Sequence, residues 1–123
     1  MAALNPISLA RRYVNLSNKH DLTATISLFS DDAIYHSVFV GKLYGKAAIL
    51  EMMGHYFSDV PDVHWQTSNY QQLQPLIVRF NFKMSGISKK TGKLISRSDI
   101  EEIGFDSQGL IESVKVGSPI LIG

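Results

Sequence analysis

The residue pattern of the chain changes at Pro61, and this change restricts the possible folds more than any other feature of the sequence. Before Pro61, apolar residues recur at spacings of three and four, which is typical of amphipathic helices. After it come runs rich in β-branched and aromatic residues, separated by short turns, over 63–73, 76–85, 93–105 and 110–116. Helices followed by successive antiparallel strands predict an α+β fold, with the helices packed on one face of a curved sheet.

Start signals mark two of the helices expected in the first half. Asn5 and Asp21 are good N-cap residues, and Pro6 suits the first helical position. The segment AIYHSVFV is rich in β-branched and aromatic residues and predicts a strand that ends before a turn at Gly41 and Lys42. In chain order we expect a helix over 5–19, a short helix that ends before 30–32, a strand over 33–40 and a helix over 45–59.

Length and composition predict a single globular domain over 1–123. The chain has 123 residues, of which 45% are hydrophobic and 19% charged, as in ordinary folded domains. Its net charge of +1 gives no basic excess, so we expect no nucleic-acid partner. There is no cysteine, which excludes disulfides, thiol nucleophiles and zinc–thiolate sites.

Two further absences bear on location and cofactors. The longest apolar runs are far shorter than the ~18 residues of a membrane span, and no basic region precedes an apolar stretch at the N-terminus. We therefore expect no membrane partner and a cytoplasmic protein. Because His36, His55 and His64 lack metal-like spacing to one another or to a carboxylate, we predict no metal site and no cofactor.

The segment SRSDIEEIGF, residues 96–105, combines charge and apolar character on one strand face. With a period of two, that face carries Arg97, Asp99, Glu101, Ile103 and Phe105. One interpretation is an exposed strand half with salt bridges, such as a pair between Arg97 and Glu101. The other is a strand that runs from a packed core into a polar-lined pocket, where a buried carboxylate must be paired or protonated.

Methionine and aromatic residues supply candidate walls for such a pocket. They would suit a flat or greasy small molecule, which is the partner that we expect. The alternative is that these side chains are simply core. The candidates for ligand contact are Arg97, Met53, Phe57, Trp65, Phe80 and Phe82.

Short motifs in the first half carry a resemblance to a known superfamily. They are N-x-x-D-L at 18–22, L-F-x-D-D-A at 28–33 and G-K-x-A-I at 45–49. With them, residues 8–117 resemble the nuclear-transport-factor-2-like superfamily, and within it the SnoaL-like and ketosteroid-isomerase-like branch. The resemblance implies a cone-shaped roll, in which three helices pack on a strongly curved, mostly antiparallel sheet around an apolar pocket. It also implies a homodimer formed through the outer sheet face.

The resemblance also suggests roles for four residues. An isomerase of this family needs a carboxylate base and two donors that hold the oxygen of a dienolate. The donor positions fall on Tyr13 and Glu101, and the base position falls on Ser37. Because an unassisted serine hydroxyl does not accept a proton near neutral pH, Asp99 is the most plausible replacement base.

Since the fold hosts many activities, the sequence is compatible with three functions. The first is an isomerase or cyclase that acts on a hydrophobic carbonyl compound. The second is a non-catalytic domain that binds a hydrophobic ligand or mediates dimerisation. The third is an epoxide hydrolase-like site, in which Arg97 and Asp99 would need a third carboxylate, available only from Glu112.

Overall fold

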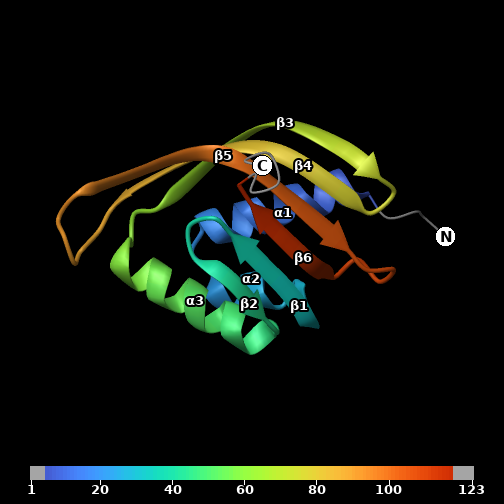
Figure 1. The fold of residues 1–123 in the computed structure, drawn as a ribbon, viewed down its shortest axis with the longest axis horizontal. Helices are drawn as coiled ribbons and strands as arrows, with labels where there is room; N and C mark the ends of the chain where they lie inside the picture. The colour runs from blue at the N-terminus through green and yellow to red at the C-terminus, as the bar shows by residue number, and fades with distance from the viewer. Residues whose placement is uncertain (1–4, 118–123) are drawn as a thin grey trace.

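A computed structural model describes residues 5–117 and shows three helices packed against one curved sheet (Figure 1). The α+β class expected from the sequence is confirmed. The helices are α1 (Pro6–Asn18), α2 (Leu22–Ile26) and α3 (Lys46–Asp59). The strands are β1 (Phe29–Ser37), β2 (Gly41–Tyr44), β3 (His64–Gln74), β4 (Ile77–Ile87), β5 (Leu94–Phe105) and β6 (Ile111–Val116).

The six strands form one open sheet in the order β2-β1-β6-β5-β4-β3. All neighbouring pairs are antiparallel except β1 and β6, which run parallel. The sheet is therefore mostly antiparallel, as predicted. Strands β2 and β3 form its two edges, so it curves around the helices without closing into a barrel (Figure 1).

The predicted helix starts are present. The Asn5 side chain accepts a hydrogen bond of 3.1 Å from the Ser8 amide, and that of Asp21 accepts one of 3.0 Å from the Ala24 amide. Helix α3 follows Gly45, whose φ of +90° is readily adopted by glycine alone. Local sequence therefore determines where each helix begins.

The strand predicted over 33–40 is wrong at both ends. Strand β1 starts earlier, at Phe29, and ends at Ser37, and residues 38–40 form a turn. Where a turn was predicted, Gly41 instead begins β2, which pairs back onto β1 from Ser37 to Ile34. The apolar residues at 38–40 suggested a strand, but their side chains are 39–49% exposed and lie in the turn.

The core lies between the helices and the inner face of the sheet. Phe29, Ile103, Phe105 and Ile111 are each at most 3% exposed, and the ring of Tyr13 packs edge-on against Phe29 with centroids 5.7 Å apart. Ile103 and Phe105 thus pack in the core, as the strand pattern predicted. Within residues 5–117, no helix has the length and apolarity needed to cross a membrane.

Candidate functional site

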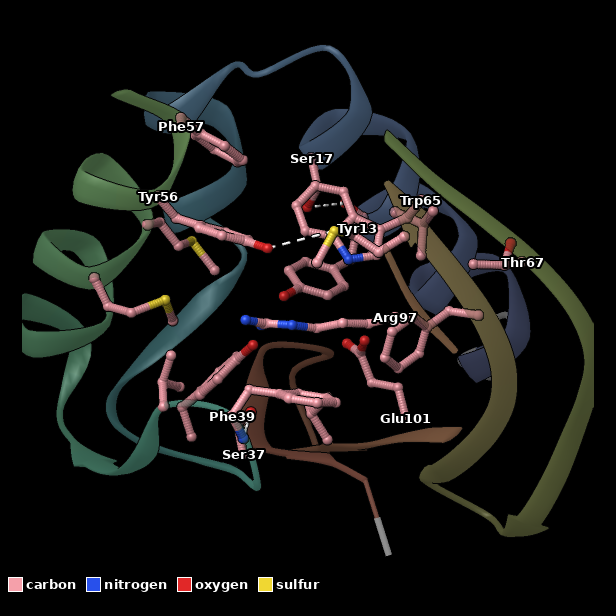
Figure 2. A pocket seen from close by; sticks show the side chains of 18 of the residues that line it. Tyr13, Ser17, Ser37, Phe39, Tyr56, Phe57, Trp65, Thr67, Arg97 and Glu101 are labelled. Carbon is pink, nitrogen blue, oxygen red and sulfur yellow. Dashed lines mark hydrogen bonds between the residues drawn. The ribbon is translucent and has the colours of Figure 1, made fainter. Parts of the chain in front are cut away.

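A cavity of about 80 Å³ lies between the helices and the inner face of the sheet (Figure 2). The apolar residues expected from the sequence lie on its wall: Met53, Phe57, Trp65, Phe80 and Phe82. Its polar lining consists of Tyr13, Ser17, Tyr35, Ser37, Tyr56, Thr67, Arg97 and Glu101. The cavity is therefore mainly apolar, with polar groups that converge on it from α1, α3, β1, β3 and β5.

Glu101 is the carboxylate of this cavity. Its side chain comes from β5, between Phe80 of β4 and Val116 of β6, and the residue is only 6% exposed. Burial raises the pKa of Glu101 to about 8, because the charged form loses its hydration. Among the described residues no basic side chain lies within ion-pair distance of its carboxyl group. At neutral pH this acid is mostly protonated and can donate a hydrogen bond into the cavity.

Two tyrosines share the cavity with Glu101. Burial, followed by the charge of Glu101, raises the pKa of Tyr13 well above its ordinary value. Burial and then Glu101 also raise the pKa of Tyr35. Both hydroxyls therefore keep their protons throughout the physiological range and act as hydrogen-bond donors. Figure 2 shows Tyr13 pointing from α1 into the cavity beside Glu101.

Sequence reasoning missed Tyr35, although a signal for it was present. In a strand, residues two apart share a face, so Tyr35 points to the same side as Ser37. The predicted base position at Ser37 therefore implied Tyr35 as well. Tyr56 of α3 also lines the cavity, and its hydroxyl donates a hydrogen bond to the Met84 sulfur at 3.4 Å (Figure 2).

The two candidates for a base differ in position. Ser37 is 4% exposed and lines the cavity, but its hydroxyl oxygen accepts a hydrogen bond of 3.0 Å from the Phe39 amide. Asp99 is absent from the cavity wall, and its carboxylate accepts a hydrogen bond of 2.8 Å from the adjacent Ile100 amide. The structure therefore does not bring Asp99 together with Glu101 and Tyr13. Alternation assigned Asp99 to a strand face but did not show that its side chain turns back onto the backbone.

Arg97 lies at the cavity without joining Glu101. Its guanidinium lies over the Phe39 ring, 4.4 Å from the centroid, and in Figure 2 its side chain reaches between Tyr56 and Phe39. The predicted pair between Arg97 and Glu101 is absent among the described ion pairs. The neighbouring acid, Glu102, instead pairs with Arg79 at 3.4 Å on the opposite face of the sheet.

The epoxide hydrolase-like arrangement is not assembled in the described residues. It required Arg97, Asp99 and Glu112 around one water-sized space. Of these, Arg97 alone lines the cavity, and Glu112 is exposed on β6. A metal centre is not assembled either, since residues 5–117 contain no group of three histidines and carboxylates positioned to hold an ion.

The chain belongs to the SnoaL-like domain family, whose pattern matches residues 10–112. The match begins within α1 and ends in the first residues of β6, so it covers α2, α3 and strands β1 to β5 in full. No curated protein sequence matches this chain.

Solved structures with the same fold are distant in sequence. The epoxide hydrolase/cyclase-like enzyme SalBIII, which acts in pyran ring formation in the polyether salinomycin, is 15% identical, with a TM-score of 0.82 over 91% of this chain and 88% of that one. A polyketide cyclase-like protein of Xanthomonas campestris is 15% identical, with a TM-score of 0.73 over 89% and 87%. A Mycobacterium tuberculosis protein in complex with estradiol-17β-hemisuccinate is 12% identical, with a TM-score of 0.79 over 89% and 90%. At these identities the likeness shows the fold alone.

Proposed function

We propose that this protein is an enzyme of isomerase or cyclase type that acts on a hydrophobic carbonyl compound, with Glu101 as the proton-transferring group. The observation that supports this most directly is a carboxyl group 6% exposed at an apolar cavity, with no cation paired to it in the described chain. Its pKa of about 8 suits general acid–base catalysis, which works best when the catalytic pKa lies near the operating pH.

In the proposed reaction, the ionised form of Glu101 removes a proton from the carbon next to the substrate carbonyl. The electron pair of the broken C–H bond moves to the carbonyl oxygen, and the hydroxyls of Tyr13 and Tyr35 donate hydrogen bonds to the resulting enolate. An isomerase then returns the proton from Glu101 to another carbon. In a cyclase, the enolate carbon attacks a second carbonyl of the same molecule, and Glu101 protonates the new alkoxide. Either cycle restores the starting state of Glu101.

The names of the structural relatives agree with this reaction class, since they include a cyclase and an epoxide hydrolase/cyclase-like enzyme. Ser37 favours the second candidate function, a pocket that binds a hydrophobic molecule without turnover. Its hydroxyl accepts the Phe39 amide and occupies the position where the resemblance leads us to expect a base. In the proposed enzyme, Glu101 performs both proton transfers, so Ser37 and Asp99 are not needed as bases.

The test is exchange of the α-protons of an apolar ketone for deuterium. We would incubate 2-decalone and cyclohexanone with the protein in D₂O and follow the loss of the α-proton signals by NMR. We expect wild-type protein to accelerate exchange and Glu101→Gln to lower the rate by roughly 10²- to 10⁴-fold. Glu102→Gln is the matched control, because Glu102 lies on the same strand but faces outward.

Two outcomes would contradict the enzyme. If Glu101→Gln exchanged the protons as fast as wild type, Glu101 would not be the proton-transferring group. If wild-type protein bound the ketones without exchange above the buffer rate, the non-catalytic pocket would be the better description.

We also propose that the chain forms a homodimer through the outer face of the sheet and works in the cytoplasm. Exposed side chains of β3, β4 and β5, among them Gln66, Asn81 and Lys83, provide a broad polar surface there. Light scattering coupled to size exclusion tests the assembly, and a mass of one chain at micromolar concentration would contradict it.

A further inference from the structure

Arg97 is a positive charge at the cavity that the proposed proton transfer does not use. It is half-buried, lines the cavity, and has the Phe39 ring as its close partner at 4.4 Å. None of the ion pairs among the described residues includes it. A guanidinium carries five N–H donors in a planar fork, and stacking on an aromatic ring leaves these donors available to a ligand.

The charge of Arg97 is not cancelled by the acid in the same cavity. Among the described residues on its wall, Arg97 and Glu101 are the charged types, and Glu101 is mostly neutral at pH 7 because burial raises its pKa to about 8. The three tyrosines Tyr13, Tyr35 and Tyr56 are neutral as well. At neutral pH the cavity therefore carries a net positive charge at one place, beside Phe39.

Most of the remaining wall is apolar. Met53, Phe57, Trp65 and Phe82 surround the space with methionine and aromatic side chains, and Figure 2 shows Phe57 and Trp65 on the side of the cavity away from Phe39. A ligand that fits this wall needs an apolar body with one anionic group at the end near Phe39. A planar carboxylate matches the arginine fork in a bidentate manner.

We infer that the natural ligand of this cavity is an amphipathic carboxylic acid, whose carboxylate pairs with Arg97 and whose apolar body extends inward to Glu101. This inference rests on the proposed function and deepens it, because it makes the substrate an acid that carries its reacting carbonyl at the end remote from Arg97. Arg97 and Glu101 are four residues apart on β5, which separates their Cα atoms by roughly 13 Å. The two side chains therefore enter the cavity from different positions along the strand.

The cavity is small enough that a ligand must move a side chain to enter, and Arg97 is one of the side chains that can move. Its volume of about 80 Å³ is smaller than the ~150 Å³ that holds benzene in an engineered protein cavity. A ligand of one or two rings therefore has to displace a side chain. Arg97 and Phe39 are the candidates, since both are partly exposed, whereas Phe80 and Phe82 are at most 4% exposed.

The experiment compares two probes with the same ring system, 2-naphthoate and 2-naphthamide, by isothermal titration calorimetry at pH 7. Wild type, Arg97→Gln and Arg97→Lys would be measured, with Lys83→Gln as the matched control. Lys83 lies on β4, pairs with Ser98 in register and faces outward, so its removal changes the net charge equally without touching the cavity. Thermal melts of each variant show whether it is folded.

We expect wild type and Lys83→Gln to bind 2-naphthoate at least tenfold more tightly than 2-naphthamide. Arg97→Gln is expected to lose this preference while keeping its affinity for 2-naphthamide, and Arg97→Lys to keep part of the preference. Equal binding of both probes to wild type, or no binding of either, would overturn the inference, as would an unchanged preference in folded Arg97→Gln.

The outcome is independent of catalysis, because neither probe has an exchangeable α-proton. If ketone exchange fails while the naphthoate preference depends on Arg97, the protein is an acid-binding pocket without the proposed turnover. If exchange depends on Glu101 while wild type shows no naphthoate preference, the enzyme stands and the substrate class is wrong.

Discussion

The same face of β5 packs in the core at one end of the strand and lines the cavity at the other. Ile103 and Phe105 belong to the buried apolar cluster that contains Phe29 and Ile111, whereas Arg97 and Glu101 face the cavity. Burial does not separate the two parts, since Ile103 is 0% and Glu101 only 6% exposed. The difference lies in what each side chain faces, which is a packed apolar side chain in one case and an open space in the other.

The extent of β6 accounts for this difference. Strand β5 pairs with β4 from Leu94 to Gly104, which is almost its whole length, but with β6 from Glu101 to Phe105 alone. The part flanked by strands on both sides is core, and the cavity begins where β6 ends. Glu101 lies at that boundary, which explains how a carboxyl group can be buried and still face a space.

The largest expected effect contrasts a core phenylalanine with a cavity phenylalanine. Phe29 is 1% exposed, so Phe29→Ala is expected to lower the free energy of unfolding by about 4 kcal/mol, because it removes a full ring and leaves a void. Phe57→Ala, at the half-buried cavity wall, is expected to cost less than half of that. Urea denaturation measures both, and equal losses would show that the two regions are packed alike.

The next effect is a pH dependence of stability due to Glu101. Since its pKa rises from 4.5 when unfolded to about 8 when folded, the folded chain binds the proton more tightly. The stabilisation is complete below pH 4.5 and is lost as the pH rises to about 8. We expect the free energy of unfolding to fall by on the order of 3 kcal/mol between pH 5 and pH 8.

The control for this slope is Glu101→Gln, which cannot ionise. We expect the difference in unfolding free energy between wild type and this variant to change by that amount over the same pH range. A constant difference would mean that the carboxyl is solvated or paired in solution, and the comparison of the two parts of β5 would fail.

A smaller effect tests the tyrosines as oxygen donors. Tyr13→Phe and Tyr35→Phe each remove one hydroxyl and leave the ring in place. Each is expected to slow ketone exchange roughly tenfold, or about 1.4 kcal/mol. Tyr56→Phe is the control, because its hydroxyl is engaged with Met84. A similar loss in all three variants would point to a general packing effect.

The smallest effect concerns Ser37. Ser37→Ala removes the acceptor of the Phe39 amide and is expected to cost about 1 kcal/mol of stability. We expect its exchange rate to stay within about threefold of wild type, since the hydroxyl holds the turn and does not transfer protons. A hundredfold loss of the exchange rate in the folded variant would show that Ser37 takes part in catalysis.

The sequence predicted the fold class, the helix starts and the four later strands, because these depend on local caps and on periodicity. Alternation also placed Arg97 and Glu101 on the face that lines the cavity. It failed at Asp99 because a period of two assigns a face and says nothing of a side chain that bonds to its own backbone. The turn at 38–40 was missed because its residues are apolar and yet exposed, whereas apolar residues are usually buried in a strand or helix.

The parallel pairing of β1 with β6 has a consequence for how the chain folds. These strands lie near opposite ends of the sequence, and β6 also joins the β1–β2 hairpin to the β3–β4–β5 meander. During synthesis, the helices and both groups of strands can form before β6 leaves the ribosome, but the sheet cannot become continuous without β6. Contacts between distant parts of a chain form slowly, so we expect β6 to complete the molecule late. The cavity, which begins where that strand ends, would then be the last feature to take shape.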